Sequence, residues 1–258
     1  MCYEASQLAE KIYREAIRIG ASDADVQRLK LKWESLKEVH KNYYHSTGFS
    51  HEQFAVFTHD EKLNLELGNW GLIPSWVKTE LKAEEIRNKT INARGETIFE
   101  KPSFKISALK NRCILPLNGF YEHHHRNGKT YPYFIEKKDK KRLLIGGITN
   151  SWINEQTGEI INTFSIVTTK GNSALAKIHN NPKLNEPRMP LILDEINCKQ
   201  WLSGNKNEAT QLIKTNHKIE LNTHTVRRLK GRDYLGNIKS AQDEYSHPEL
   251  LHPPSLFD

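Results

Sequence analysis

The chain has 258 residues, and 38 Lys and Arg against 31 Asp and Glu give it a formal net charge of +7. Charged residues make up 27% and apolar residues 37%, which suits a folded domain with a core rather than a disordered chain. No run approaches the roughly 18 apolar residues of a membrane span, and Met1–Glu4 lacks the features of a signal peptide, so we expect a cytoplasmic protein. The three cysteines, at positions 2, 113 and 198, form no CxxC pair, which disfavours a disulfide scaffold and a cysteine-only zinc site.

Two helices are predicted at the start of the chain. Apolar residues at helical spacing, with Gly20 as a stop, predict a helix over 5–20. A second helix is predicted from about 23 to 43 with Ser22 as its cap. Its apolar face is formed by Val26, Leu29, Trp33, Leu36, His40 and Tyr43. This face covers under three heptads, which indicates packing onto the body of the protein rather than a coiled coil.

From residue 49 onward, short apolar runs between turn residues predict strands. The predicted strands are Phe54–Phe57, Tyr131–Ile135, Leu143–Ile148, Phe164–Thr168 and Leu191–Leu193. Further predictions are helices over 78–87, 172–179, 194–203 and 206–215, and an irregular proline-containing tail over 241–258. Because strands and helices do not alternate regularly, and no phosphate-binding glycine loop is present, we predict a mainly antiparallel α+β fold with a single domain over 1–240.

Cys2 stands out by its position. A small second residue permits removal of Met1, which would leave Cys2 with a thiol and an α-amine on adjacent carbons. The reference pKa of an α-amine is about 7.7–8.0, so an appreciable fraction of the amine is neutral at pH 7. Such a 1,2-aminothiol reacts with an aldehyde to give an imine, and the thiol then closes a thiazolidine ring at low entropic cost. Position alone, however, favours the alternative that Cys2 is an ordinary second residue.

Three further groups have both a chemical and an ordinary interpretation. Glu122 follows an apolar strand and a Gly turn, where partial burial would raise its pKa and make it a proton donor; a surface glutamate is the alternative. His179 ends a predicted helix and suits acid–base chemistry near neutral pH, although an isolated histidine is more often structural. The run His123–His125 suggests a metal, but adjacent side chains diverge and no partner stands at metal-ligand spacing, so we predict no metal and no cofactor.

Basic and aromatic segments are consistent with nucleic acid binding. No acid lies between Glu100 and Glu122, as on a phosphate-facing surface or an ordinary solvated loop. The stretch Lys214–Arg232 is also basic. The segment Asn69–Trp76 has two tryptophans beside Gly and Pro, which suits a loop that stacks on bases; buried packing is the alternative for each of them.

The order of these segments resembles the SOS response-associated peptidase (SRAP) family, whose members are also called abasic site processing proteins. The matching pieces are Met1-Cys2, Trp70-Gly-Leu-Ile-Pro-x-Trp76, Asn92-Ala-Arg94-x-Glu96, Lys101-Pro-x-Phe104, Arg112-Cys-x-x-Pro-x-x-Gly-Phe-Tyr-Glu122, a Gly-Gly-Ile strand and His179 followed by Arg188-Met-Pro. Single pieces are weak, whereas all seven in this order, from residue 2 to about 240, are very specific. The resemblance implies a twisted, barrel-like β core flanked by helices, with 21–43 as an extra helix.

The resemblance also implies a DNA-damage protein that senses abasic sites in single-stranded DNA, as a monomer. Cys2 would capture the aldehyde of the opened sugar as a thiazolidine, and the peptidase label would describe self-removal of what precedes Cys2. By similarity, Asn92 would position the N-terminal residue or the sugar. Glu122 would handle protons, and His179 would be the acid or base for ring opening and slow reversal.

DNA contacts are implied in the same way. Arg94 and Arg188 would clamp phosphates, a use that suits the guanidinium fork. Trp70 would stack or wedge near the strand, and Trp76 would pack. Lys105 and Arg112 in the basic segment would add further contacts with DNA.

This sequence departs from the family pattern at three places. Tyr3-Glu4 stands where members commonly have Gly-Arg, and Tyr44–Gly48 lacks the proline of the usual Tyr-Asn-x-x-Pro segment. An insertion over 180–187 opens the compact His-Asp-Arg-Met-Pro motif. Two other functions stay open, a Cys/His peptidase acting on other proteins and a noncovalent single-stranded DNA-binding module.

Overall fold

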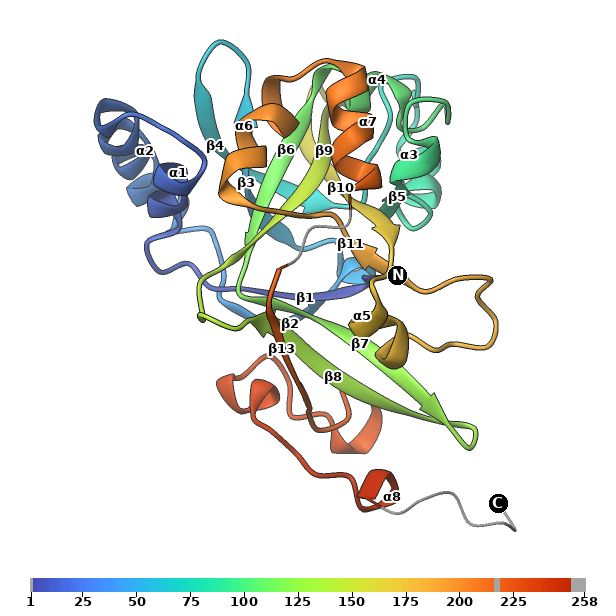
Figure 1. Ribbon diagram of the computed structural model, residues 1–258. Coiled ribbons are helices and arrows are strands. Elements are labelled where there is room, and N and C mark those ends of the chain that lie inside the picture. The colour runs from blue at the N-terminus through green and yellow to red at the C-terminus, as the bar shows by residue number, and fades with distance from the viewer. Residues whose placement is uncertain (1, 216–218, 252–258) are drawn as a thin grey trace.

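Five strands close into a barrel at the centre of the molecule (Figure 1). The structure, a computed structural model, describes residues 2–215 and 219–251. Each strand of the barrel is hydrogen-bonded to the next, in the order β10 (Ile160–Lys170), β4 (Leu63–Trp70), β3 (Gln53–His59), β6 (Arg112–Leu117) and β9 (Leu143–Ile153), which returns to β10. All of these pairings are antiparallel except that of β4 with β10. The predicted α+β fold with a mainly antiparallel, barrel-like core is confirmed.

A second sheet lies below the barrel in Figure 1 and carries the start of the chain. Its antiparallel strands are, in order, β13 (Leu221–Thr225), β8 (Lys129–Lys137), β7 (Gly119–Arg126), β1 (Glu4–Gln7) and β2 (Tyr43–Thr47). Only Asn118 separates β6 of the barrel from β7 of this sheet, and its backbone N–H donates to the Ser6 carbonyl at 2.8 Å. The first residues of the chain therefore lie where the two sheets meet.

Helices and short strands complete the structure. The short strands β5 (Asn92–Arg94) and β11 (Arg188–Pro190) pair with β10, and β12 (Ile192–Leu193) pairs with β9. The helices are α1 (Glu15–Arg18), α2 (Asp23–Leu36), α3 (Glu80–Arg87), α4 (Lys105–Lys110), α5 (Ser173–Ile178), α6 (Glu195–Ser203), α7 (Lys206–Lys214) and α8 (Pro248–Leu251). The 3-10 helices are η1 (Ile12–Arg14), η2 (Gly48–Ser50), η3 (Gly95–Thr97), η4 (Gly231–Asp233) and η5 (Lys239–Gln242). Within the described residues, no helix is long and apolar enough to cross a membrane.

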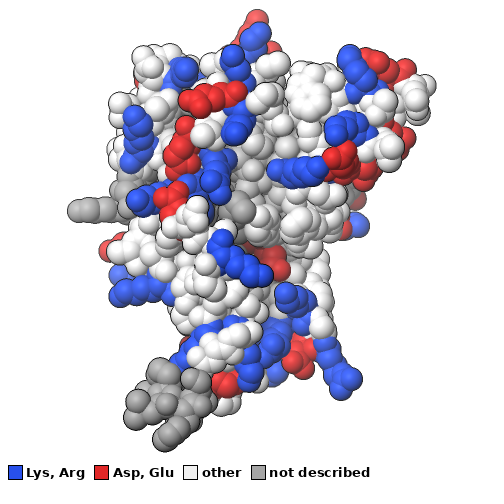
Figure 2. Space-filling model, turned by 90° about the vertical axis from the view of Figure 1, so that its right-hand side faces the viewer, with Lys and Arg blue, Asp and Glu red and all other residues white. Residues whose placement is uncertain are grey.

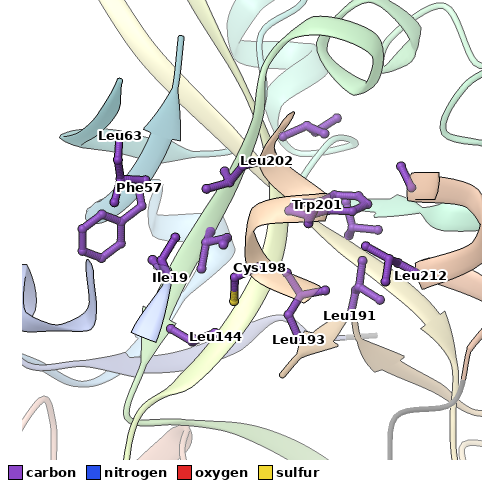
Figure 3. Close-up of a cluster of buried hydrophobic side chains, with 14 of the residues drawn as sticks. Ile19, Phe57, Leu63, Leu144, Leu191, Leu193, Cys198, Trp201, Leu202 and Leu212 are labelled. Atoms are coloured by element: carbon purple, nitrogen blue, oxygen red, sulfur yellow. The ribbon is translucent and has the colours of Figure 1, made fainter. Parts of the chain in front are cut away.

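Apolar side chains form two main clusters because successive residues of a strand point to opposite faces. In β3, Phe54 and Val56 belong to one cluster, which also holds Cys2, whereas Ala55 and Phe57 belong to the other. Figure 3 shows part of the second cluster, where side chains of α6 lie against the barrel strands. Strands buried on both faces read as continuous apolar runs, which explains why these segments could be predicted from the sequence.

Most of the predicted elements are found in the structure. The predicted strands fall in β3, β8, β9, β10 and the β11–β12 region, and the helices predicted from residue 78 onward correspond to α3, α5, α6 and α7. The helix predicted over 5–20 is wrong at its start, because Glu4–Gln7 form β1. The Gln7 amide donates to the Ala55 carbonyl at 2.9 Å, and this and the pairing with β2 and β7 outweigh the helical spacing of the later residues.

Two other segments differ from the prediction. The helix expected to reach residue 43 ends at Leu36, because Tyr43–Thr47 pair with β1 as β2. The expected irregular tail from residue 241 includes α8 and folds back on the body, where Tyr245 N–H donates to the Thr225 carbonyl at 2.8 Å. Residues 252–258 of that tail, residues 216–218 of the basic stretch and Met1 lie outside the described residues.

Candidate functional site

Cys2 is buried where β1 begins, between β2 and β7. Glu4 pairs with Thr47 on one side and with Tyr121 on the other, which fixes the start of the chain between them. The free thiol of Cys2 belongs to the same apolar cluster as the barrel interior. Burial raises its pKa, and the neighbouring Glu122 carboxylate raises it further, so the sulfur carries its proton at neutral pH.

A carboxyl and an imidazole meet beside Cys2. Glu122 Oε2 on β7 lies 3.6 Å from His179 Nδ1, which stands at the end of α5, and both side chains are about 5% exposed. Burial raises the pKa of Glu122 to about 8 and lowers the pKa of His179 to about 4. Near neutral pH, the pair therefore consists of a protonated carboxyl and a neutral imidazole, which is the arrangement of an acid beside a base.

The His179 ring is positioned from two sides. Asn172 caps α5 by accepting from Leu175 N–H at 2.9 Å, and this capped helix ends at His179. On the other side, His179 Nδ1 lies 2.9 Å from the Arg188 carbonyl and 3.3 Å from the Arg188 N–H. The residues between them leave the body as a loop, at whose start Asn180 exchanges hydrogen bonds with the His125 backbone at 2.6 and 2.8 Å. The insertion thus leaves His179 and Arg188 adjacent in space.

Arg188 is engaged within the protein. Its guanidinium donates to both carboxylate oxygens of Glu96, at 2.8 and 2.7 Å, and to Glu186 at 2.9 Å. Its side chain is 3% exposed. A phosphate would have to displace two carboxylates, so this burial and pairing correct the expectation that Arg188 clamps DNA. Its observed contacts instead tie β11 to η3 and to His179.

Asn92 carries a buried amide that has no hydrogen-bond partner among the described residues. It lies on β5, opposite Ile166 of β10. Both polar atoms of its side chain are buried, and neither has a hydrogen-bond partner among the described residues. Leaving such groups unsatisfied costs about 1–3 kcal/mol each, and a bound group with its own donor and acceptor would recover that cost.

A cleft of about 450 Å³ opens next to Asn92. Arg94 is exposed and lines it with Trp76, which is 45% exposed, and with Lys101 from the following loop. Lys105 is exposed at the start of α4, one residue after the cleft residue Phe104. The aromatic and cationic groups of this cleft suit a single nucleic acid strand. Figure 2 views the side of the molecule where the chain starts and shows Lys and Arg, with Asp and Glu among them, above and below a mostly uncharged surface.

Trp76 lines the cleft, although packing was expected for it from the sequence, whereas Trp70 lies in the core. Trp70 is fully buried, donates from Nε1 to the Ile91 carbonyl at 2.9 Å, and stacks on Phe164. The signal that separates the two tryptophans is Pro74, since Trp70 ends a strand and Trp76 follows the Pro turn. The burial of Trp70 corrects the expectation that it stacks on bases, because no part of its ring is accessible to a base.

Arg112 is also buried and does not reach a surface. Its guanidinium donates to the carbonyls of Ala108 and Trp201, at 2.7 and 2.5 Å, and to that of Gly204. These bonds join β6 to α4 and α6, so Arg112 is a structural residue, which corrects its expected DNA contact. Among residues 2–215 and 219–251, no group of three or more His, Cys, Asp or Glu side chains is arranged to hold a metal ion.

The fold and the site define a barrel protein in which a thiol, a carboxyl and an imidazole meet at the start of the chain. Residues 7–231 match the family model described as SOS response associated peptidase (SRAP), and the chain belongs to this family. The resemblance noted from the sequence motifs is thereby confirmed.

Two named relatives and one solved structure agree with this assignment. The chain is 38% identical over 144 residues to the abasic site processing protein YoqW of Bacillus subtilis, covering 55% of this chain and 59% of YoqW. It is 32% identical over 173 residues to the abasic site processing protein HMCES of Gallus gallus, covering 58% and 49% of the two chains. The matched segments thus span about half to three fifths of these relatives. A crystal structure from Bacteroides thetaiotaomicron has a TM-score of 0.79 and 32% identity and covers 95% of this chain and 100% of its own.

Proposed function

We propose that this protein captures abasic sites in single-stranded DNA as a covalent adduct of Cys2, formed after Met1 is removed. The observation that carries the proposal is the buried pair of Glu122 and His179 beside the Cys2 thiol. Two relatives are named as abasic site processing proteins, which supports the choice of substrate. The proposed activity is therefore aldehyde capture, which shields the lesion, and the same site would remove the residue that precedes Cys2.

Ring opening of the abasic sugar is the first step. The sugar is mostly a cyclic hemiacetal, and its aldehyde appears when the C1′ hydroxyl loses a proton and the ring oxygen gains one. The neutral imidazole of His179 would accept the first proton, and the protonated carboxyl of Glu122 would deliver the second. The amide of Asn92 would hold the sugar or the new N-terminus through its unpartnered atoms.

Capture follows in two steps. The proton that His179 accepted first returns to Glu122, whose carboxyl oxygen lies 3.6 Å from the ring. The α-amine of Cys2 then adds to the aldehyde carbon, and one of its protons moves to the oxygen to give a hydroxyl. Glu122 protonates this hydroxyl, which leaves as water, and the last proton of the nitrogen returns to Glu122 as the imine forms. The thiol then adds to the imine carbon while its proton passes to the nitrogen, which closes the thiazolidine ring. The raised pKa of the thiol supports this order, because the amine rather than a thiolate is the first nucleophile.

DNA would be held by the cleft beside Asn92. Arg94, Lys101 and Lys105 would contact phosphates, and Trp76 would stack on a base. These groups are exposed, unlike Trp70, Arg112 and Arg188. A DNA-binding role also fits the cytoplasmic residence expected from the sequence.

A denaturing gel tests this proposal. Purified protein is mixed with a single-stranded oligonucleotide that carries one abasic site, and a shifted band that survives denaturation is expected. The band should disappear in Cys2→Ala and persist in Cys198→Ala, which removes another buried cysteine on α6. Full crosslinking by Cys2→Ala would contradict the proposal.

Two other functions predict different outcomes. A Cys/His peptidase acting on other proteins would cleave peptides without DNA and would need the thiol but not the free amine, so acetylation of the amine separates the two. A noncovalent binder would retain single-stranded DNA regardless of the lesion and would leave no band after denaturation.

A further inference from the structure

We propose that Tyr3 and Phe49 form a stacking platform for the nucleobase that adjoins the captured abasic site. The Tyr3 and Phe49 rings are stacked, with centroids 5.4 Å apart and an interplanar angle of 26°. Phe49 is 55% exposed although it is a large apolar side chain, and Tyr3 is partly buried beside it. The proposal rests on the proposed function and adds to it a subsite for a base directly beside Cys2.

The platform is held rigidly at the site. Phe49 lies in η2, where the Gly48 N–H donates to the Tyr3 carbonyl at 2.8 Å and Thr47 Oγ1 accepts from the Phe49 N–H at 3.4 Å. A Cβ on Gly48 would overlap Ile91 and stand 3.2 Å from the Trp70 ring. The η2 turn therefore packs closely against Ile91, which precedes Asn92. The two stacked rings therefore form an aromatic surface that is fixed next to Cys2 and fits the face of a nucleobase.

The occupant follows from the neighbours of the two rings. Tyr3 follows Cys2 directly, and the Glu122 carboxyl is close enough to raise the pKa of the Tyr3 hydroxyl, so Tyr3 borders the place where the captured sugar would be held. Burial and Glu122 raise the pKa of Tyr3, and the positive charge of Arg94 lowers it in part, so Arg94 lies near Tyr3. The Arg94 side chain is exposed. A cation for the phosphate beside a ring for the base is the usual arrangement of single-strand recognition.

Fluorescence of 2-aminopurine gives a direct readout of stacking. Oligonucleotides carry 2-aminopurine on the 5′ or the 3′ side of the abasic site and are bound to the Cys2→Ala protein, so that no covalent step is needed. Binding should quench the probe on one of the two sides. The quenching should be lost when Phe49→Ala is added, kept with Phe49→Tyr and unchanged with Ile196→Ala, a matched exposed residue on α6. Quenching that is equal with and without the Phe49 ring would overturn the proposal.

Kinetics of the covalent step separate stacking from a merely structural role. With normal bases beside the lesion, Phe49→Ala should slow adduct formation by about 5- to 150-fold, the range expected for one base–aromatic stack. With base-free tetrahydrofuran residues on both sides of the lesion, wild type and Phe49→Ala should react at the same rate. An equal loss on both substrates, or no loss on either, would contradict the platform. If wild type forms no adduct, the proposed function is contradicted. The 2-aminopurine experiment needs no adduct and would still show whether a base stacks on Phe49.

Discussion

Glu122 and His179 owe their chemistry to where they are buried. Neither residue type is unusual, and the sequence could nominate both only as candidates, because burial is set by β7, α5 and β11 together. The same holds for the two tryptophans, whose exposure depends on packing and not on their motif. Residue types at a site can therefore be predicted from a sequence, whereas protonation states and accessibility need the fold.

The carboxyl of Glu122 should be essential for rate and dispensable for binding. In Glu122→Gln the amide keeps the shape but cannot deliver a proton, so we expect adduct formation to slow by about 100-fold or more. Single-turnover kinetics on denaturing gels measure the rate, and fluorescence anisotropy measures DNA affinity. Unchanged kinetics would remove Glu122 from the mechanism, and a parallel loss of affinity would assign it a binding role.

The same residue should make stability depend on pH. The folded-state pKa of Glu122 is about 8, above its ordinary value of 4.5, because burial favours the protonated form. The contribution of this group is therefore complete below about pH 4.5 and is lost as pH rises through 8. Glu122→Gln, which stays neutral, should melt at a higher temperature than wild type at pH 9 and at a similar temperature at pH 5. An identical difference in melting temperature at both pH values would contradict the raised pKa.

At the scale of elements, segments buried on both faces were predictable and segments defined by distant partners were not. The strands β9 and β10 contain continuous apolar runs, whereas β1 and β2 are polar and become strands only by pairing with each other and with β7. The site depends on β1 and β2, the strands that form only by pairing with distant segments. For this reason, the reactivity of Cys2 could be predicted from the sequence, whereas its buried position between β2 and β7 could not.

The η2 turn offers a test of this dependence. Gly48→Ala places a methyl group against Ile91 and Trp70, which should push the turn away from β5 and cost about 1–3 kcal/mol of the free energy of unfolding. We also expect slower adduct formation, because the displaced turn is hydrogen-bonded to Tyr3 and packs against Ile91, the residue before Asn92. Urea denaturation and gel kinetics measure the two effects. Wild-type stability and rate in Gly48→Ala would show that the close packing at this turn is not needed.

At the scale of the whole molecule, the net charge of +7 is small, and its placement matters more than its size. Arg94, Lys101 and Lys105 are exposed along or beside the cleft. Replacing all three with Ala should weaken binding to single-stranded DNA and reduce the slope of log affinity against log salt by about 2, since each phosphate contact on a single strand contributes about 0.7.

A matched charge change elsewhere controls for net charge. Lys30, Lys32 and Lys37 lie on or just after α2, away from the cleft residues. Replacing these three with Ala removes the same charge and should leave the salt slope within about 0.5 of wild type. Equal slopes in the two triple variants would contradict the cleft as the path of the strand.

The central claim is that Cys2, freed of Met1, bonds to the abasic sugar through both its amine and its thiol. Intact-mass and peptide mass spectrometry of the adduct test it most directly. The account predicts a mass equal to the protein without Met1 plus the oligonucleotide minus one water, with the modification on the peptide that begins at Cys2. An adduct that retains Met1, or that maps to any other residue, would contradict it.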